Sequence, residues 1–194
     1  GYDLIIPVYN EKNIVKIIEY IFKNSKKILN IYLCYDHEED ITLKLLKKSY
    51  YSKYQNIILL KNYSNGPCEA VKTGIKISNA DAVIVYPADD FNNAPILDKM
   101  YELYEQGYDI VCPSRFIKGG IIKNCPYIKL IIVKLVSFLL FYFSKLKIYD
   151  PTNGFRLFSK EFIKKNKIES KLGFAYSLEL LIKAKKCDNM IIEI

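Results

Sequence analysis

The stretch Ala82-Val-Ile-Val-Tyr-Pro-Ala-Asp-Asp-Phe-Asn-Asn-Ala-Pro95 indicates both a fold class and a candidate site. Its first residues are apolar, which is typical of a buried strand in a parallel sheet. The strand then ends in two adjacent carboxylates, Asp89 and Asp90. Carboxylate oxygens at the end of a core strand are suitable ligands for a divalent cation. An Asp-rich turn is also a common way to end any strand, so the stretch alone leaves both interpretations open.

Short apolar runs alternate with helical patterns on both sides of this stretch. The expected strands are residues 2–8, 31–35, 56–60, 82–86 and 109–113. Amphipathic helical patterns separate them, and Asn10 stands where it can cap the first helix. Such alternation predicts an α/β domain with a mostly parallel central sheet flanked by helices.

Each expected strand ends in polar residues. The clusters are Tyr9-Asn10-Glu11, Asp36, Asn65-Gly66, Asp89-Asp90 and Ser114-Arg115. Ligands of parallel sheets bind outside the carboxyl ends of the strands, so we expect these clusters to meet at one edge. Polar loops are common in any protein, so each cluster alone is weak evidence. The combination of carboxylates with an arginine and a glycine turn at one edge predicts a binding site.

The charge of the chain favours an anionic partner. The net charge is +8, and only two of the 29 basic residues are arginines, Arg115 and Arg156. A basic surface suits phosphorylated substrates, nucleic acid or an anionic membrane. No motif combines basic and stacking residues, so we do not expect nucleic acid as a partner.

Several other protein classes are disfavoured by missing motifs. The chain has no G-x-G-x-x-G after its first strand, no G-x-x-x-x-G-K-[ST] and no G-x-S-x-G. Its five scattered cysteines indicate a reducing compartment, and its single histidine, His37, argues against a zinc site.

The segment 126–143 is almost uniformly apolar but contains Lys129 and Lys134. Its charge-free run is too short to cross a bilayer, which needs ~20 apolar residues. A buried core helix and a helix in the membrane interface fit the pattern equally well. In the second case the flanking Lys123, Lys145 and Lys147 would reach toward the lipid phosphates.

Two further polar stretches follow this segment. Residues 149–158 read as a tight turn entering a strand, with Gly154 at an unusual backbone angle and Asp150 or Arg156 over a substrate. Glu179 lies among leucines of a helix and faces either the cleft or solvent. The last residues read as the middle of a strand, so we expect the natural protein to continue beyond Ile194.

These motifs together are similar to a known family. The matching pieces are Ile6–Glu11, Asp36, Gly66 with Ala70 and Gly74, Ala88-Asp89, Ser114-Arg115, Asp150–Arg156 and Glu179–Lys183. The chain resembles the inverting family-two glycosyltransferases with a GT-A, Rossmann-like fold, and among them the dolichol-phosphate mannose synthase-like branch. The resemblance implies a single domain over 1–194. Its nucleotide-sugar-binding half is 1–115, and its acceptor half is 116–194 with an apolar helix at 126–146.

The resemblance also assigns roles to particular residues. The implied nucleotide-sugar residues are Pro7, Tyr9, Asn10, Glu11, Asp36, Gly66 and Asp89. Asp89 matches the second carboxylate of the D-x-D motif that holds Mg²⁺ or Mn²⁺ on a GDP- or UDP-sugar. The first position of that motif is Pro87 here, and Asp90 follows as a substitute ligand. The implied catalytic residues are Asp89, Asp90, Arg115 and Arg156.

The implied acceptor is a polyprenyl phosphate, bound by Arg115, Lys134 and Ser137. A lipid phosphate is already anionic at pH 7 and needs no general base. A saccharide hydroxyl, as in surface polysaccharide synthesis, would need one, either Asp90 or Glu179. A non-catalytic nucleotide-sugar or lipid-binding domain is the remaining alternative. We expect a cytoplasmic protein, peripheral on the inner face of the membrane.

Overall fold

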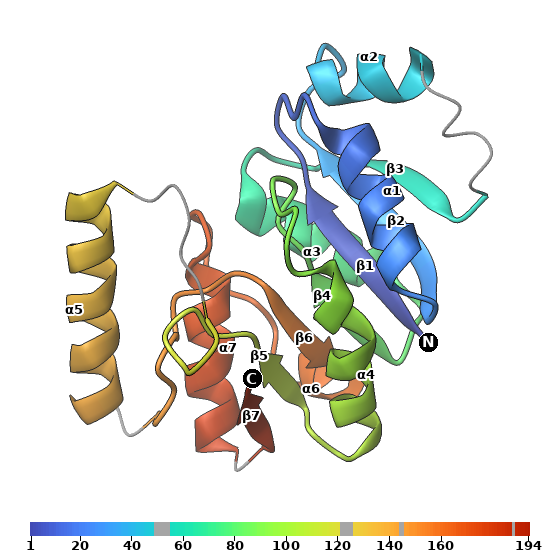
Figure 1. The fold of residues 1–194 in the computed structure, drawn as a ribbon. Coiled ribbons are helices and arrows are strands. Elements are labelled where there is room, and N and C mark those ends of the chain that lie inside the picture. Colours follow the sequence, from blue (N-terminus) through green and yellow to red (C-terminus); the bar gives the residue numbers. More distant parts are fainter. Residues whose placement is uncertain (49–54, 121–125, 144–145, 188) are drawn as a thin grey trace.

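One seven-stranded sheet organises the molecule, in the order β3-β2-β1-β4-β6-β5-β7 (Figure 1). The computed structural model describes residues 1–48, 55–120, 126–143, 146–187 and 189–194. Cys125, Lys123 and Lys145 lie outside the described residues. The strands are β1 (Tyr2–Pro7), β2 (Ile28–Tyr35), β3 (Ile57–Lys61), β4 (Ala82–Val85), β5 (Ile110–Cys112), β6 (Arg156–Ser159) and β7 (Ile191–Glu193). All pairings are parallel except those of β6 with β4 and β5, so the predicted mostly parallel α/β fold is confirmed.

Helices cover both faces of the sheet (Figure 1). They are α1 (Ile14–Asn24), α2 (Ile41–Lys48), α3 (Pro67–Ile77), α4 (Leu97–Glu105), α5 (Tyr127–Phe143), α6 (Lys160–Lys165) and α7 (Ala175–Lys186), with a short 3₁₀ turn η2 (Ala94–Ile96). Side chains of a strand point alternately to the two faces. Leu4 and Ile6 of β1 therefore pack in the core beneath α1 and α4, and Ile5 packs in the core beneath α3, α6 and α7.

The reversed strand β6 brings a late part of the chain to the edge where the early strands end. Val85, the last residue of β4, pairs with Arg156, the first residue of β6. The turn before β6 therefore lies at the carboxyl edge of β1 and β4. The strand β7 runs parallel to β5 and places Glu193 beside Cys112 at the same edge.

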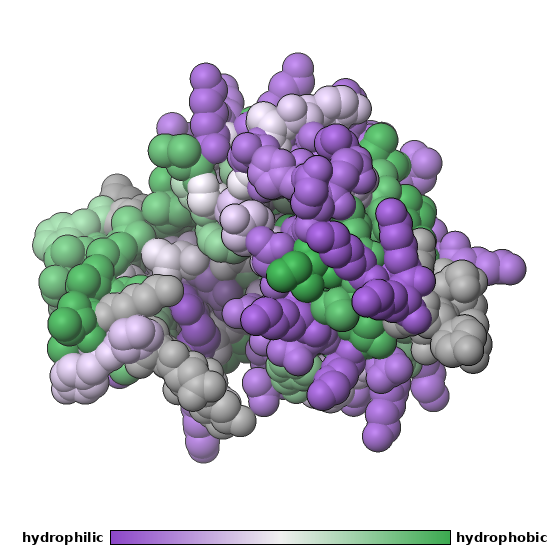
Figure 2. Space-filling model, turned by 90° about the horizontal axis from the view of Figure 1, so that it is seen from above, coloured by the Kyte–Doolittle hydropathy of each residue, from purple (hydrophilic) through white to green (hydrophobic). Residues whose placement is uncertain are grey.

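Helix α5 stands apart from the sheet at one end of the molecule (Figure 1). Its exposed apolar residues are Tyr127, Ile128, Ile131, Ile132, Leu135, Val136, Phe138, Leu139, Tyr142 and Phe143. Figure 2 shows hydrophobic side chains gathered at this end of the molecule. The interpretation of this segment as a buried core helix is therefore wrong. Among the described helices, none combines the length and hydropathy that crossing a bilayer requires.

Candidate active site

A pocket of about 240 Å³, here the Asp89 pocket, opens at the carboxyl ends of β1 and β4. Its lining residues are Pro7, Tyr9, Glu11, Val85, Tyr86, Pro87, Ala88, Asp89, Gly154 and Phe174. The fold thus brings together residues 7, 9 and 11, expected to hold a nucleotide, and the expected metal ligand, residue 89.

The loop that follows β1 is fixed by the start of α2. Asp40 is almost fully buried and accepts the backbone N–H of Asn10 with both carboxylate oxygens, at 3.0 and 3.1 Å. The hydroxyl of Thr42 accepts the N–H of Glu11 at 2.9 Å. These bonds hold one wall of the Asp89 pocket in place.

Asn10 itself does not cap the helix that follows it. Its backbone adopts a φ of 52°, and its Oδ1 accepts the N–H of Ile41 at 3.1 Å. Helix α1 begins after Asn13 and receives no side-chain cap from the residues that the structure describes. The predicted capping role of Asn10 in α1 is therefore wrong, because its side chain serves the start of α2.

Asp36 and Gly66 meet at the ends of β2 and β3 but line neither cavity described here. The carboxylate of Asp36 accepts the Nδ2–H of Asn62 at 2.8 Å and the N–H of Gly66 at 3.0 Å. Gly66 has a φ of 102°, a backbone conformation that other residues adopt only under strain. It directly precedes α3, so the turn role expected for Gly66 agrees with its geometry.

The two adjacent aspartates have different surroundings. Asp89 is exposed and lines the pocket, whereas Asp90 does not line it. Asp90 Oδ1 accepts the N–H groups of Asn92 and Asn93 at 2.8 and 3.0 Å, so this carboxylate stabilises its own turn.

No cluster of three metal-ligating side chains occurs among the described residues. The carboxylates that line the pocket are Asp89 and Glu11. Mg²⁺ often binds through one or two carboxylates and takes its other ligands from substrate phosphates and water. The exposed carboxylate of Asp89 therefore fits a divalent ion that is shared with a phosphorylated substrate.

A second cavity of about 610 Å³, here the α5 cleft, lies between α5 and the sheet edge. Its lining residues are Arg115, Phe116, Ile117, Gly120, Leu130, Lys134, Ser137, Phe138, Phe141, Tyr142 and Tyr149. All three residues expected to bind an acceptor phosphate, at positions 115, 134 and 137, line this cleft. Its other walls are mainly apolar and aromatic.

Ser137 lies on the face of α5 that lines this cleft. Its side chain is almost fully buried, and its Oγ has no hydrogen-bond partner in the described part of the chain. An unpaired buried hydroxyl costs about 1–3 kcal/mol. Lys134, which is exposed, lies three residues earlier on the same face. Together the two side chains provide polar contacts for a ligand inside an otherwise apolar cleft.

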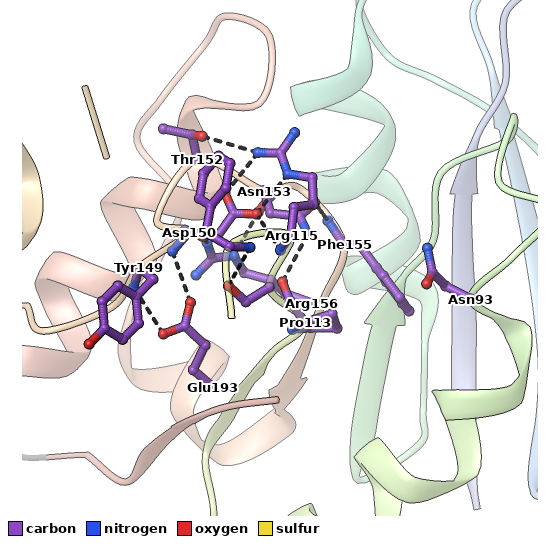
Figure 3. Close-up of polar contacts among 12 residues, drawn as sticks. Asn93, Pro113, Arg115, Tyr149, Asp150, Thr152, Asn153, Phe155, Arg156 and Glu193 are labelled. Atoms are coloured by element: carbon purple, nitrogen blue, oxygen red, sulfur yellow. Dashed lines mark hydrogen bonds and ion pairs between the residues drawn. The ribbon is translucent and has the colours of Figure 1, made fainter. Parts of the chain in front are cut away.

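Arg115 is oriented by a buried carboxylate (Figure 3). Its Nε and Nη2 donate to the two oxygens of Asp150, each at 2.7 Å, and its backbone N–H donates to the same group at 3.0 Å. Asp150 is fully buried, and Glu193 of β7 accepts its backbone N–H at 2.8 Å. Such a bidentate pair fixes the plane of the guanidinium.

Arg156, expected to be catalytic, lies fully buried and lines neither cavity. Its Nε and Nη2 donate to the carbonyl oxygens of Asn153 and Asp150 at 2.7 and 2.9 Å, and its Nη1 donates to Cys112 Sγ at 3.2 Å. Burial raises the pKa of that thiol to about 11, despite the nearby guanidinium. The geometry gives Arg156 the role of holding the 150–154 turn closed.

Glu179 is bound to the segment in front of α7. Its carboxylate accepts the N–H groups of Glu169 and Ser170, both at 2.8 Å, and the Nζ–H of Lys183 at 2.7 Å. Burial alone would raise the pKa of Glu179, but these hydrogen bonds outweigh it and lower the pKa to about 2. A group with so low a pKa is a weak general base at neutral pH.

Sequence reasoning missed several residues that build the site. Asp40 precedes a helical pattern, and this capping signal was available. Nothing in the local sequence marks Glu193 or Phe174. The expectation of an unusual backbone angle at Gly154 is wrong, because the φ of Gly154 is not positive. The glycine instead makes room, since a Cβ there would lie 2.7 Å from Cδ1 of Phe174.

This mostly parallel sheet, with its pocket at the carboxyl edge, has the GT-A glycosyltransferase fold. Residues 3–166 match the model of "Glycosyl transferase family 2", and the chain belongs to this family. The crystal structure of glucosyl-3-phosphoglycerate synthase from Mycobacterium tuberculosis with Mn²⁺, UDP and glucosyl-3-phosphoglycerate superposes with a TM-score of 0.76 at 16% identity. That superposition covers 100% of this chain and 68% of the synthase.

Two curated relatives place the chain in the branch that resembles dolichol-phosphate mannose synthases. The dolichol-phosphate mannosyltransferase of Pyrococcus furiosus is 29% identical over 186 residues, which cover 94% of this chain and 52% of the relative. The polyprenol monophosphomannose synthase of Mycolicibacterium smegmatis is 23% identical over 198 residues, covering 98% of this chain and 74% of the relative. The chain thus spans about half the length of the Pyrococcus protein.

Proposed function

We propose that this protein transfers a sugar from a GDP- or UDP-sugar to a polyprenyl phosphate at the cytoplasmic face of a membrane. The α5 cleft is the observation that carries this proposal. It combines polar groups with apolar walls, and a lipid phosphate combines a charged phosphate with an apolar chain. Arg115, Lys134 and the Ser137 hydroxyl, which has no hydrogen-bond partner among the described residues, suit the phosphate. The apolar walls suit the prenyl chain. The two relatives named above for dolichol-phosphate and polyprenol-phosphate mannosyl transfer support this acceptor class.

The donor would bind in the Asp89 pocket. Pro7, Tyr9 and Glu11 line one side of it, where the base and ribose would lie, and Asp89 lines the centre of the sheet edge. Asp89 would hold Mg²⁺ or Mn²⁺ jointly with the donor diphosphate. A bound ion there supplies positive charge that stabilises the departing nucleoside diphosphate. The mycobacterial synthase with Mn²⁺ and UDP supports a divalent ion in this fold.

The reaction would be a single displacement. An acceptor phosphate oxygen forms a bond to the anomeric carbon while the bond from that carbon to the diphosphate oxygen breaks, which inverts the configuration. The phosphate is already ionised at neutral pH, so the step requires orientation more than proton removal. Arg115, held in plane by Asp150, would orient the phosphate.

The alternative acceptor, a saccharide hydroxyl, would need a general base. Glu179 is poorly suited because of its pKa of about 2. The carboxylate of Asp90 is engaged by its own turn. These two observations favour the lipid phosphate.

Helix α5 would rest on the membrane. Its exposed apolar face would lie at the acyl boundary, and the exposed Lys134 would lie near a lipid phosphate. The cleft behind the helix would then face the headgroups, where a polyprenyl phosphate is presented.

The Lys134→Ala variant tests the acceptor site without disturbing a buried group, because Lys134 is exposed. We expect the KM for polyprenyl phosphate to rise about tenfold, the loss typical of a hydrogen bond to a charged group. Donor binding should stay unchanged. Lys118→Ala is the matched control, since Lys118 is exposed and does not line the cleft. An unchanged acceptor KM in Lys134→Ala would contradict the assignment of the cleft.

A further inference from the structure

Phe174 forms an unassigned wall of the Asp89 pocket. It is 51% exposed although it is a large aromatic residue, and it lines the pocket together with Gly154. A Cβ at position 154 would lie 2.7 Å from Cδ1 of Phe174. The ring is therefore seated directly against glycine, where any larger residue would force it to move.

The segment in front of Phe174 is anchored at Ser170. Glu179 accepts the N–H of Ser170 at 2.8 Å. The Ser170 carbonyl accepts hydrogen bonds from Lys72 Nζ at 2.6 Å and from Cys68 Sγ at 3.2 Å. Both polar groups of the Ser170 backbone are thus bound to neighbouring helices, which fixes the base of the wall.

The other side of the wall is tied to the turn before β6. The hydroxyl of Tyr176 donates to the carbonyl of Gly154 at 3.0 Å. The ring of Phe174 lies 6.3 Å from that of Tyr176, measured between centroids. Leu172, two residues away from Phe174, is 80% exposed and lines neither cavity. The ring of Phe174 is therefore positioned at the pocket, while its apolar neighbour is not.

The strand order assigns opposite sides of the pocket to the two exposed aromatic residues. Asp89 follows β4, which lies between β1 and β6 in the sheet. Tyr9 follows β1, on one side of Asp89, and Gly154 precedes β6, on the other. The third aromatic residue, Tyr86, is fully buried, and its hydroxyl donates to the carbonyl of Asp90.

A nucleotide sugar is a linear arrangement of base, ribose, diphosphate and sugar. If the diphosphate lies at Asp89 and the base lies on the side of Tyr9, the sugar must lie on the side of Phe174. The face of an aromatic ring is negative and attracts the partly positive C–H groups of a pyranose.

We propose that Phe174, seated on Gly154, is the platform for the donor's sugar ring and determines which sugars the pocket accepts. The inference rests on the proposed donor site, but it makes a separate claim about the sugar. Phe174 should contribute to the affinity for a nucleotide sugar and contribute little to the affinity for the nucleoside diphosphate alone.

Calorimetric titration of the full-length protein with UDP, GDP, UDP-glucose and GDP-mannose tests this claim. The comparison uses the base that the wild type binds. Phe174→Ala should lower the affinity for the nucleotide sugar about three- to tenfold. The affinity for the nucleoside diphosphate should stay within about twofold of wild type. Phe174→Tyr should retain the wild-type affinities. Leu172→Ala, the matched control, should change neither.

Gly154→Ala gives a second readout that does not remove the ring. Its methyl group displaces Phe174, so it should alter the ratio of affinities between different sugars on one base. The proposed role of Phe174 would be overturned if Phe174→Ala lowered the affinities for the diphosphate and the nucleotide sugar equally, or lowered neither. Failure of the wild type to bind any of the four probes would instead overturn the proposed donor site itself.

Discussion

Glu179 combines a strongly lowered pKa with hydrogen bonds that hold the segment in front of α7. Its side chain is 15% exposed, and Lys183 and two backbone N–H groups bind it. The substitution Glu179→Gln removes the charge and preserves the size of the side chain. The matched control is Glu161→Gln, because Glu161 and Lys165 form an exposed ion pair at the same i,i+4 spacing.

The expected loss of stability follows from the pKa. Native Glu179 has a pKa of about 2, whereas the usual value is 4.5. One unit of pKa corresponds to about 1.4 kcal/mol, so the charged group stabilises the fold by about 3 kcal/mol at neutral pH. Glu179→Gln should lower the free energy of unfolding by about 2–3 kcal/mol at pH 7. Glu161→Gln should change it by less than about 0.5 kcal/mol.

The loss should depend on pH with a defined sign. The unfolded chain takes up a proton on Glu179 below pH 4.5, whereas the native protein does so only near pH 2. The stabilisation is therefore complete above pH 4.5 and disappears as the pH falls to 2. In urea unfolding, the difference between wild type and Glu179→Gln should fall by about 2 kcal/mol between pH 7 and pH 3. A difference that stays constant from pH 7 to pH 3 would refute this reasoning.

The same variant tests the catalytic role. Loss of a general base typically lowers kcat by about 10²–10⁴-fold. We expect kcat with a phosphate acceptor to stay within about tenfold of wild type, because the nucleophile is already ionised. A larger loss, with the folded fraction unchanged, would make Glu179 a base and would favour a hydroxyl acceptor.

Two further predictions address the metal and the membrane. Asp89→Asn should weaken Mn²⁺-dependent binding of the nucleotide sugar by at least about tenfold. Asp90→Asn, which alters a turn, should retain the metal dependence. Equal metal dependence of wild type and Asp89→Asn would contradict the assignment of Asp89 as a metal ligand. Leu135→Glu with Leu139→Glu on the exposed face of α5 should abolish co-sedimentation with anionic liposomes at low salt, whereas Ile77→Glu, an exposed apolar site on α3, should not. Equal sedimentation of both variants would argue against α5 as the membrane contact.

Periodicity and strand-end chemistry were sufficient to predict the sheet and its binding edge. Short apolar runs identified β1 to β5, and the polar residues after β1 and β4 do meet in one pocket. Apolar composition could not decide where α5 lies. A run such as 127–143 has the same hydropathy in a core and on a membrane-facing surface, and only its placement away from the sheet separates the two.

The roles of individual charged residues were harder to predict. Arg115 and Arg156 are equally conspicuous in the sequence, but Arg115 lines a cleft and Arg156 is fully buried. Their difference arises from long-range contacts with Asp150 and Cys112, which local patterns do not encode. Phe174 was missed for the same reason, since its meeting with the turn before β6 depends on the reversed direction of that strand.

The acceptor class can be tested directly by offering the protein polyprenyl phosphate, the matching polyprenol and a free saccharide with a nucleotide sugar and Mg²⁺ or Mn²⁺. The product is identified by mass spectrometry. We expect the sugar on polyprenyl phosphate alone, because Arg115, Lys134 and Ser137 line a cleft suited to a phosphate on an apolar chain. Transfer to the polyprenol hydroxyl or to the saccharide, with polyprenyl phosphate left unmodified, would contradict the proposed function.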